Sequence, residues 1–152
     1  MKRLSVLALL VTVVPFAPAH AGPASRYGGC SGAVDRGSLP VWARAGFRGS
    51  YRIPHVLGKN GSIAAILFGD PLSSPPSPER ANKILWVSRH VDPNVRSLYV
   101  RARRQDGAGT AYRRLAVGPS YLDLPSAGCW RLFLRWGSQV DLLDLRYRSP
   151  SQ

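Results

Sequence analysis

The stretch Leu124-Pro125-Ser126-Ala127-Gly128-Cys129-Trp130-Arg131-Leu132-Phe133-Leu134-Arg135-Trp136 decides the fold of this chain. Pro125 and Gly128 favour a turn, and the run that follows has no glycine or proline and is rich in aromatic residues. Such a run is typical of a β-strand. Side chains of a strand alternate between its two faces. One face therefore carries Arg131, Phe133 and Arg135, and the uncharged face that we expect in the core carries Trp130, Leu132, Leu134 and Trp136.

Turn signals and short apolar runs extend this pattern in both directions. Gly137-Ser138 separates the central strand from residues 139–148, which predicts a two-residue hairpin. Prolines at four positions within residues 69–80 exclude a central strand there and predict a surface loop. We see no amphipathic helix, and turn signals recur about every ten residues, as in β-sandwiches. Further strands are predicted at residues 39–43, 56–57, 62–68, 83–89, 96–104, 111–117 and 121–124.

These observations predict an all-β fold, an immunoglobulin-like antiparallel β-sandwich of about eight to nine short strands. The first 21 residues have a basic start, a short apolar run and the cleavage pattern Ala19-His20-Ala21, which together predict a secretory signal peptide. Cleavage after Ala21 is expected, with Ala19 as the alternative. We expect an irregular arm over residues 22–37, a single sandwich domain over 38–148 and a polar tail over 149–152. The predicted product is secreted, or extracytoplasmic.

The chain has two cysteines, Cys30 and Cys129. An even count in an exported protein predicts one disulfide, here between residues 99 positions apart in the sequence. The alternative is two free thiols or two metal ligands, but isolated cysteines lack the spacing of a zinc site. No metal and no cofactor are predicted.

The chain is strongly basic. It has 21 lysines and arginines against 8 acidic residues, a net charge of +13, and nearly all of the basic residues are arginines. Removal of the predicted signal peptide takes away Lys2 and Arg3 and leaves +11. Such a charge favours acidic partners such as nucleic acid, anionic lipid or cell-wall polymer. The alternative is a compositional bias of a high-GC genome, in which arginine replaces lysine throughout.

Three fragments carry a resemblance: Asn82-Lys83-Ile84-Leu85-Trp86, Pro119-Ser120-Tyr121-Leu122-Asp123-Leu124-Pro125 and Gly128-Cys129-Trp130. Together they resemble an uncharacterised group of small exported proteins from high-GC Gram-positive bacteria, over about residues 56–147. The turn that leads into the Cys-Trp strand also resembles the penultimate strand of bacterial immunoglobulin-like domains. Cys30 departs from that pattern because it lies in a glycine-rich arm. The disulfide could therefore staple this arm to the sandwich instead of joining two sheets. The resemblance implies a fold and a location, and no catalytic residue.

No catalytic constellation is evident. The chain has no Gly-x-Ser-x-Gly elbow and no phosphate-binding loop, and after export only His55 and His90 remain as histidines. Asp141 and Asp144 are three positions apart, so a strand would point them to opposite faces and they could not act as an acid–base pair. We expect the acidic residues to balance neighbouring arginines. No catalytic residue is predicted.

The candidate site is a surface. Outward positions on three predicted strands would form a basic face with interleaved aromatic rings if the strands share one sheet. Arginine forks match phosphate and carboxylate groups, and aromatic faces stack on sugars or bases. The alternative is a solvated face whose arginine stems lie along the rings. The four tryptophans are expected in the core. The candidate binding residues are Tyr99, Arg101, Arg103, Arg131, Phe133, Arg135, Arg146 and Arg148.

The sequence therefore predicts a secreted, non-catalytic binding module at the cell envelope. Its expected partner is an anionic polymer, such as a teichoic-acid-like or acidic glycan chain, or else a protein. No specific nucleic-acid partner and no membrane span after signal cleavage are expected. One alternative is a small exported enzyme acting on cell-wall glycan with an atypical site. Another is a structural or inhibitory protein that presents the proline-rich loop.

Overall fold

The computed structural model describes residues 30, 32–44, 47–48 and 50–150, so the predicted signal peptide lies outside the described residues. Eight strands and one short 3-10 helix, η1, make up its regular structure. Within the described residues, no helix has the length and apolar character needed to cross a membrane. The elements are η1 (Val41–Ala43), β1 (His55–Leu57), β2 (Ile63–Leu67), β3 (Lys83–Ser88), β4 (Ser97–Arg104), β5 (Thr110–Ala116), β6 (Pro119–Tyr121), β7 (Gly128–Trp136) and β8 (Gln139–Tyr147).

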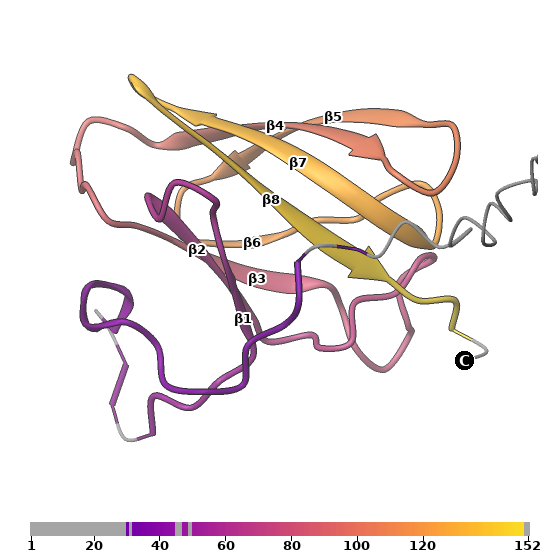
Figure 1. Ribbon diagram of the computed structural model, residues 1–152, viewed down its shortest axis with the longest axis horizontal. Coiled ribbons are helices and arrows are strands. Elements are labelled where there is room, and N and C mark those ends of the chain that lie inside the picture. Colours follow the sequence, from indigo (N-terminus) through magenta and orange to yellow (C-terminus); the bar gives the residue numbers. More distant parts are fainter. Residues whose placement is uncertain (1–29, 31, 45–46, 49, 151–152) are drawn as a thin grey trace, which may run out of the picture.

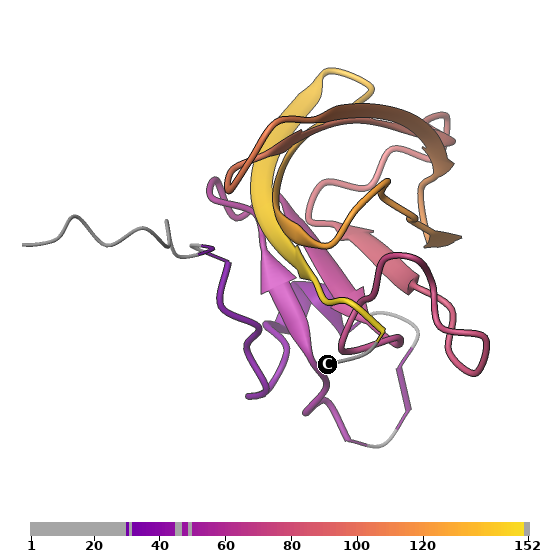
Figure 2. The ribbon, with the colours of Figure 1, turned by 90° about the vertical axis from the view of Figure 1, so that its right-hand side faces the viewer.

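The strands form two antiparallel sheets that face each other (Figure 1). One sheet has the order β1-β2-β3-β6 and the other β5-β4-β7-β8, and the second curves strongly over the first (Figure 2). The chain changes sheet after β3, after β5 and after β6, which gives the Greek-key connections of immunoglobulin-like folds. The predicted all-β sandwich is therefore confirmed, with eight strands.

The core follows the alternation predicted for the central strand. Trp130 and Trp136 of β7 and Trp86 of β3 are buried between the sheets. Each indole N–H of these three donates a hydrogen bond of 2.9–3.0 Å to an oxygen of a nearby serine residue, so burial leaves no ring nitrogen without an acceptor. Trp42 differs from the prediction, because it is only half-buried and packs outside the sandwich.

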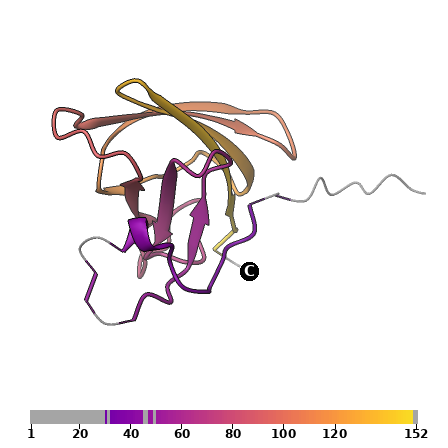
Figure 3. The same cartoon turned by 60° about the vertical axis from the view of Figure 1, so that its left-hand side comes forward.

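The predicted strand at 39–43 is wrong. After Pro40, which has no N–H to offer a sheet, Val41–Ala43 form η1 instead. This segment packs on the outer face of the first sheet, where Leu39 and Ala43 cover Ala64 and Ile66 of β2 (Figure 3). Because β2 is covered on both faces, all five of its residues are buried.

The predicted strand at 121–124 is also displaced. The strand in this region is β6, Pro119–Tyr121, and it lies at the edge of the first sheet with β3 as its neighbour. A proline is tolerated on an edge strand because its missing N–H faces away from the sheet. Leu122 and Leu124 follow the strand and turn into the core.

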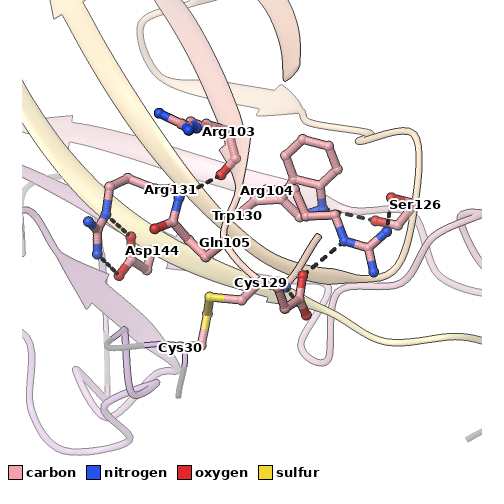
Figure 4. The surroundings of a disulfide bond; sticks show 10 residues. Cys30, Arg103, Arg104, Gln105, Ser126, Cys129, Trp130, Arg131 and Asp144 are labelled. Carbon is pink, nitrogen blue, oxygen red and sulfur yellow. Dashed lines mark hydrogen bonds and ion pairs between the residues drawn. A yellow bond between two sulfur atoms is a disulfide. The ribbon is translucent and has the colours of Figure 1, made fainter. Parts of the chain in front are cut away.

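The predicted disulfide between Cys30 and Cys129 is confirmed, with 5.4 Å between the two Cα atoms. It joins the N-terminal arm (described residues 30 and 32–37) to β7 (Figure 4). Gly32 packs so closely on β8 that an added Cβ would lie 2.0 Å from the backbone oxygen of Asp144. Asp35 then exchanges two backbone hydrogen bonds with His55 of β1. The arm therefore passes from one sheet to the other across the β8–β1 edge, and the disulfide staples it there.

Candidate functional site: an arginine–aromatic face

The outer face of the second sheet collects most of the predicted binding residues. The antiparallel registers place outward-pointing side chains of all four strands in three rows across the sheet. We call this surface the arginine–aromatic face. Its rows, each read from β5 through β4 and β7 to β8, are Thr110-Arg103-Arg131-Asp144, Tyr112-Arg101-Phe133-Leu142 and Arg114-Tyr99-Arg135-Val140.

Arginine and aromatic side chains alternate within and between two of these rows, and they stack on one another. The guanidinium carbon of Arg101 lies 4.5 Å from the ring centre of Phe133, and that of Arg135 lies 4.7 Å from the ring centre of Tyr99. Arg114 approaches Tyr99 at 5.7 Å. A guanidinium has five N–H donors, so an arginine over a ring can still donate hydrogen bonds to an anion.

Arg131 is the exception, because it already has an acidic partner. Its Nε and a terminal nitrogen donate to the two carboxylate oxygens of Asp144 at 2.9 and 3.0 Å (Figure 4). The Asp144 side chain is 1% exposed, and its hydrogen bonds and negative charge raise the pKa of the Arg131 guanidinium. This pairing neutralises Arg131, so we expect it to contribute little to binding an anion.

Four arginines of the face have no such compensation. The side chains of Arg101, Arg103, Arg114 and Arg135 are exposed. In the part of the chain that the structure describes, none of them forms an ion pair with a carboxylate, although Arg114 donates to the hydroxyl of Ser97 at 3.1 Å. The face therefore carries an excess of about four positive charges, which favours an anionic ligand.

Two adjoining hollows form a trough along β4. A hollow of about 680 Å³ is lined by Tyr99, Phe133 and the aliphatic Val140 and Leu142, together with three of the uncompensated arginines. A second, of about 780 Å³, lies over Arg103 and the loop that connects β4 and β5. The two hollows share Arg101, Tyr112 and Phe133, so they lie side by side.

Two carboxylates, the buried Asp141 and the exposed Asp106, hold the two ends of the trough in place. At the first end, Asp141 accepts hydrogen bonds of 2.9 Å from the backbone N–H groups of Asn60 and Ser62, which fixes the β1–β2 turn. Asn60 in turn lines the first hollow.

At the other end, Asp106 anchors the β4–β5 loop. It accepts hydrogen bonds from Arg104 Nε at 2.9 Å and from the backbone N–H of Cys129 at 3.0 Å. Burial acts to raise the pKa of Asp106, but these hydrogen bonds and the charge of Arg104 outweigh it and hold the pKa below 3.8. The wall of the second hollow is therefore tied to the start of β7.

Arg146 and Arg148 lie apart from this face. Arg146 has the outward direction that the alternation predicts, but it pairs with Cys129, where the arm covers the sheet. Both arginines line a separate hollow beside Cys30 and Gly32. The structure thus brings together six of the eight predicted residues, and the arm separates the other two from them.

Tyr112 and Arg114 of β5 were absent from the predicted site, as were Val140 and Leu142 of β8. The signal for the β5 residues is in the sequence: a short loop between β4 and β5 places Tyr112 opposite Arg101 and Arg114 opposite Tyr99. The β8 residues follow from the two-residue Gly137-Ser138 turn in the same way.

The described residues offer no cluster that could hold a metal ion. Among residues 30, 32–44, 47–48 and 50–150, no three His, Cys, Asp or Glu side chains gather as metal ligands would. His55 is buried under the arm, with its Nδ1 2.8 Å from the backbone oxygen of Ile53 and its Nε2 3.8 Å from a carboxylate oxygen of Asp35. Asp141 accepts a hydrogen bond from the β1–β2 turn, and Asp144 accepts one from Arg131, so the two carboxylates act at different places.

Comparison of the chain with protein-family models, with curated proteins and with solved structures returned no match.

Proposed function

We propose that this protein acts outside the cytoplasm as a non-catalytic binding module that recognises an anionic polymer through its arginine–aromatic face. The observation that carries the proposal is the set of four exposed arginines along the trough, which have no acidic partner among the described residues. The disulfide supports a location in an oxidising compartment, because such bonds persist there.

The arrangement of the arginines favours a polymer over a small anion. Neighbouring rows are two residues apart along a strand, or about 6.8 Å, so the three rows span roughly 14 Å. A single carboxylate or phosphate would meet one or two guanidinium groups at a time. A chain with repeated negative charges would engage several of them at once and gain affinity from each additional contact.

The arginine–ring contacts also lower the entropic cost of binding an anion. Arg101 and Arg135 are held over Phe133 and Tyr99, so less side-chain entropy is lost when they bind. An acidic protein partner would satisfy the same charges. The alternative in which arginine content reflects composition alone predicts that arginines on this face act no differently from exposed arginines elsewhere.

A charge-matched pair of variants tests the proposal. The first replaces Arg101, Arg114 and Arg135 with serine, and the control replaces the exposed Arg52, Arg80 and Arg89, which lie outside the trough. Both variants lose three positive charges. Binding to polygalacturonate, polyglutamate and polyphosphate, with neutral dextran as the uncharged reference, is measured by calorimetry over a series of salt concentrations.

We expect the native protein to bind the polyanions with an affinity that falls as salt rises. The first variant should bind at least tenfold more weakly, and its salt slope should be shallower by about two, since each arginine that binds an anionic group adds roughly 0.7 to the slope. The control should keep most of the affinity. Equal decreases in the two variants would mean that net charge alone drives binding, and absence of binding to every polyanion would overturn the proposal.

A further inference from the structure

One aromatic ring of the arginine–aromatic face is left open. The guanidinium groups of Arg101, Arg114 and Arg135 lie over the rings of Phe133 and Tyr99. Tyr112 is 69% exposed, and within the described ranges no guanidinium stacks on it. It lines both hollows, so its ring lies where they meet.

The groups around Tyr112 combine charge with neutral hydrogen-bonding capacity. Arg101 is its cross-strand neighbour, and Arg114 is two residues along the same strand, on the same face. Thr110 and Gln105 line the second hollow, and Asn60 lines the first. An open ring thus has guanidinium forks beside it, and hydroxyl and amide groups line the hollows on both sides.

Such an environment suits a sugar ring that carries a carboxylate. The C–H face of a pyranose packs flat on an aromatic ring, while its hydroxyls and its carboxylate project from the edge toward donors at the side. We propose that the ligand of this face is an acidic polysaccharide, with one sugar ring seated on Tyr112 and its carboxylate held by Arg101 or Arg114. This inference rests on the proposed function.

Two other polyanions fit the open ring less well. A chain of phosphates or carboxylates without rings would use the arginines and leave Tyr112 without a role. Single-stranded nucleic acid binds by stacking successive bases on successive aromatic side chains. Here arginines already occupy the other two rings of the rows, so the face offers one stacking position in place of a series.

The test compares polyanions that differ in whether they carry rings. Polygalacturonate has carboxylates on sugar rings, polyglutamate has carboxylates without them, and poly(dT) has phosphates with bases. Affinities are measured at equal ionic strength for the full chain and for Tyr112→Ala. The matched control is Tyr121→Ala, which removes a tyrosine that is 58% exposed on an edge strand of the opposite sheet. Thermal unfolding of each variant checks that it is folded.

We expect polygalacturonate to bind about tenfold more tightly than polyglutamate. Tyr112→Ala should abolish that preference and leave the affinity for polyglutamate unchanged, and Tyr121→Ala should change neither. Equal affinities for the two polymers in the native protein would overturn the inference without any variant, as would tighter binding of poly(dT). Failure of the proposed function looks different, because then no polyanion would bind or the arginine variant would bind as the native protein does.

Discussion

Removal of the disulfide should cost this protein a large part of its stability. The perturbation is the double variant Cys30→Ala with Cys129→Ala, which leaves no free thiol behind. The native bond closes a loop across a sequence separation of 99 residues, and it therefore restricts most of the unfolded sandwich. If the disulfide acts by reducing the entropy of the unfolded chain, a loop of this length stabilises the fold by about 4.7 kcal/mol at 25 °C.

The arm adds a smaller contribution from the folded state. Without the bond, the arm keeps the backbone pairing of Asp35 with His55, the packing of Gly32 on β8 and the ion pair of Arg36 with Asp70. Gly32→Ala separates the two effects, because its Cβ would meet the Asp144 backbone oxygen while the disulfide stays intact. We expect the free energy of unfolding to fall by about 4 kcal/mol in the double variant and by about 1–2 kcal/mol in Gly32→Ala.

Urea denaturation followed by tryptophan fluorescence measures the stability of both variants. Trp86, Trp130 and Trp136 are buried in the native state, so their fluorescence changes when the protein unfolds. The double variant should also show a larger dependence of the free energy of unfolding on urea, because its unfolded chain exposes more surface. A loss below about 1 kcal/mol would refute the entropic reasoning. A larger loss for Gly32→Ala than for the double variant would mean that arm packing, and not the restriction of the unfolded chain, stabilises the fold.

Three further substitutions test individual interactions. Asp106→Asn should lower the free energy of unfolding by about 1 kcal/mol at pH 7. Because the folded-state pKa of Asp106 is depressed, its stabilisation is present above pH 3.8 and is lost below it, so the variant and the native protein should converge in acid melts. Arg131→Met should lower the free energy of unfolding by about 2–3 kcal/mol, because it withdraws two hydrogen bonds from the buried Asp144 carboxylate. Adding Asp144→Leu should recover part of this loss. A greater loss in the double variant, measured by chemical denaturation, would contradict this account. Tyr147→Phe should cost about 1 kcal/mol in the same assay, because the buried hydroxyl donates to the Leu122 carbonyl at 2.7 Å, and an unchanged stability would show that this hydrogen bond makes no net contribution.

The sandwich could be predicted because its core strands have clear patterns. In β7, four inward positions are apolar and the outward positions between them carry the charges. A single register therefore buries every apolar inward side chain and keeps the charges in solvent. The Gly137-Ser138 turn then fixes β8, with Trp136 opposite Gln139. Gly137 has a φ of 53°, which a two-residue hairpin requires and a glycine adopts without strain.

The errors arose where tertiary packing overrides local pattern. Residues 39–43 are apolar enough for a strand, but they cover the outer face of a sheet, which no local pattern reveals. Arg146 points outward as predicted, yet the arm beside it comes from a segment more than a hundred residues earlier in the sequence. The contribution of β5 to the face has a different basis, because it follows from the register of β5 against β4 and not from the pattern of β5 alone.

Asp106 joins two parts of the second sheet that the sequence keeps apart. One of its carboxylate oxygens is bound to the backbone of Cys129, next to the bond that secures the arm, and the other holds Arg104 at the base of the β4–β5 loop. The loop walls one half of the trough. A single acidic side chain therefore links the strand that holds the disulfide to the loop that walls the trough.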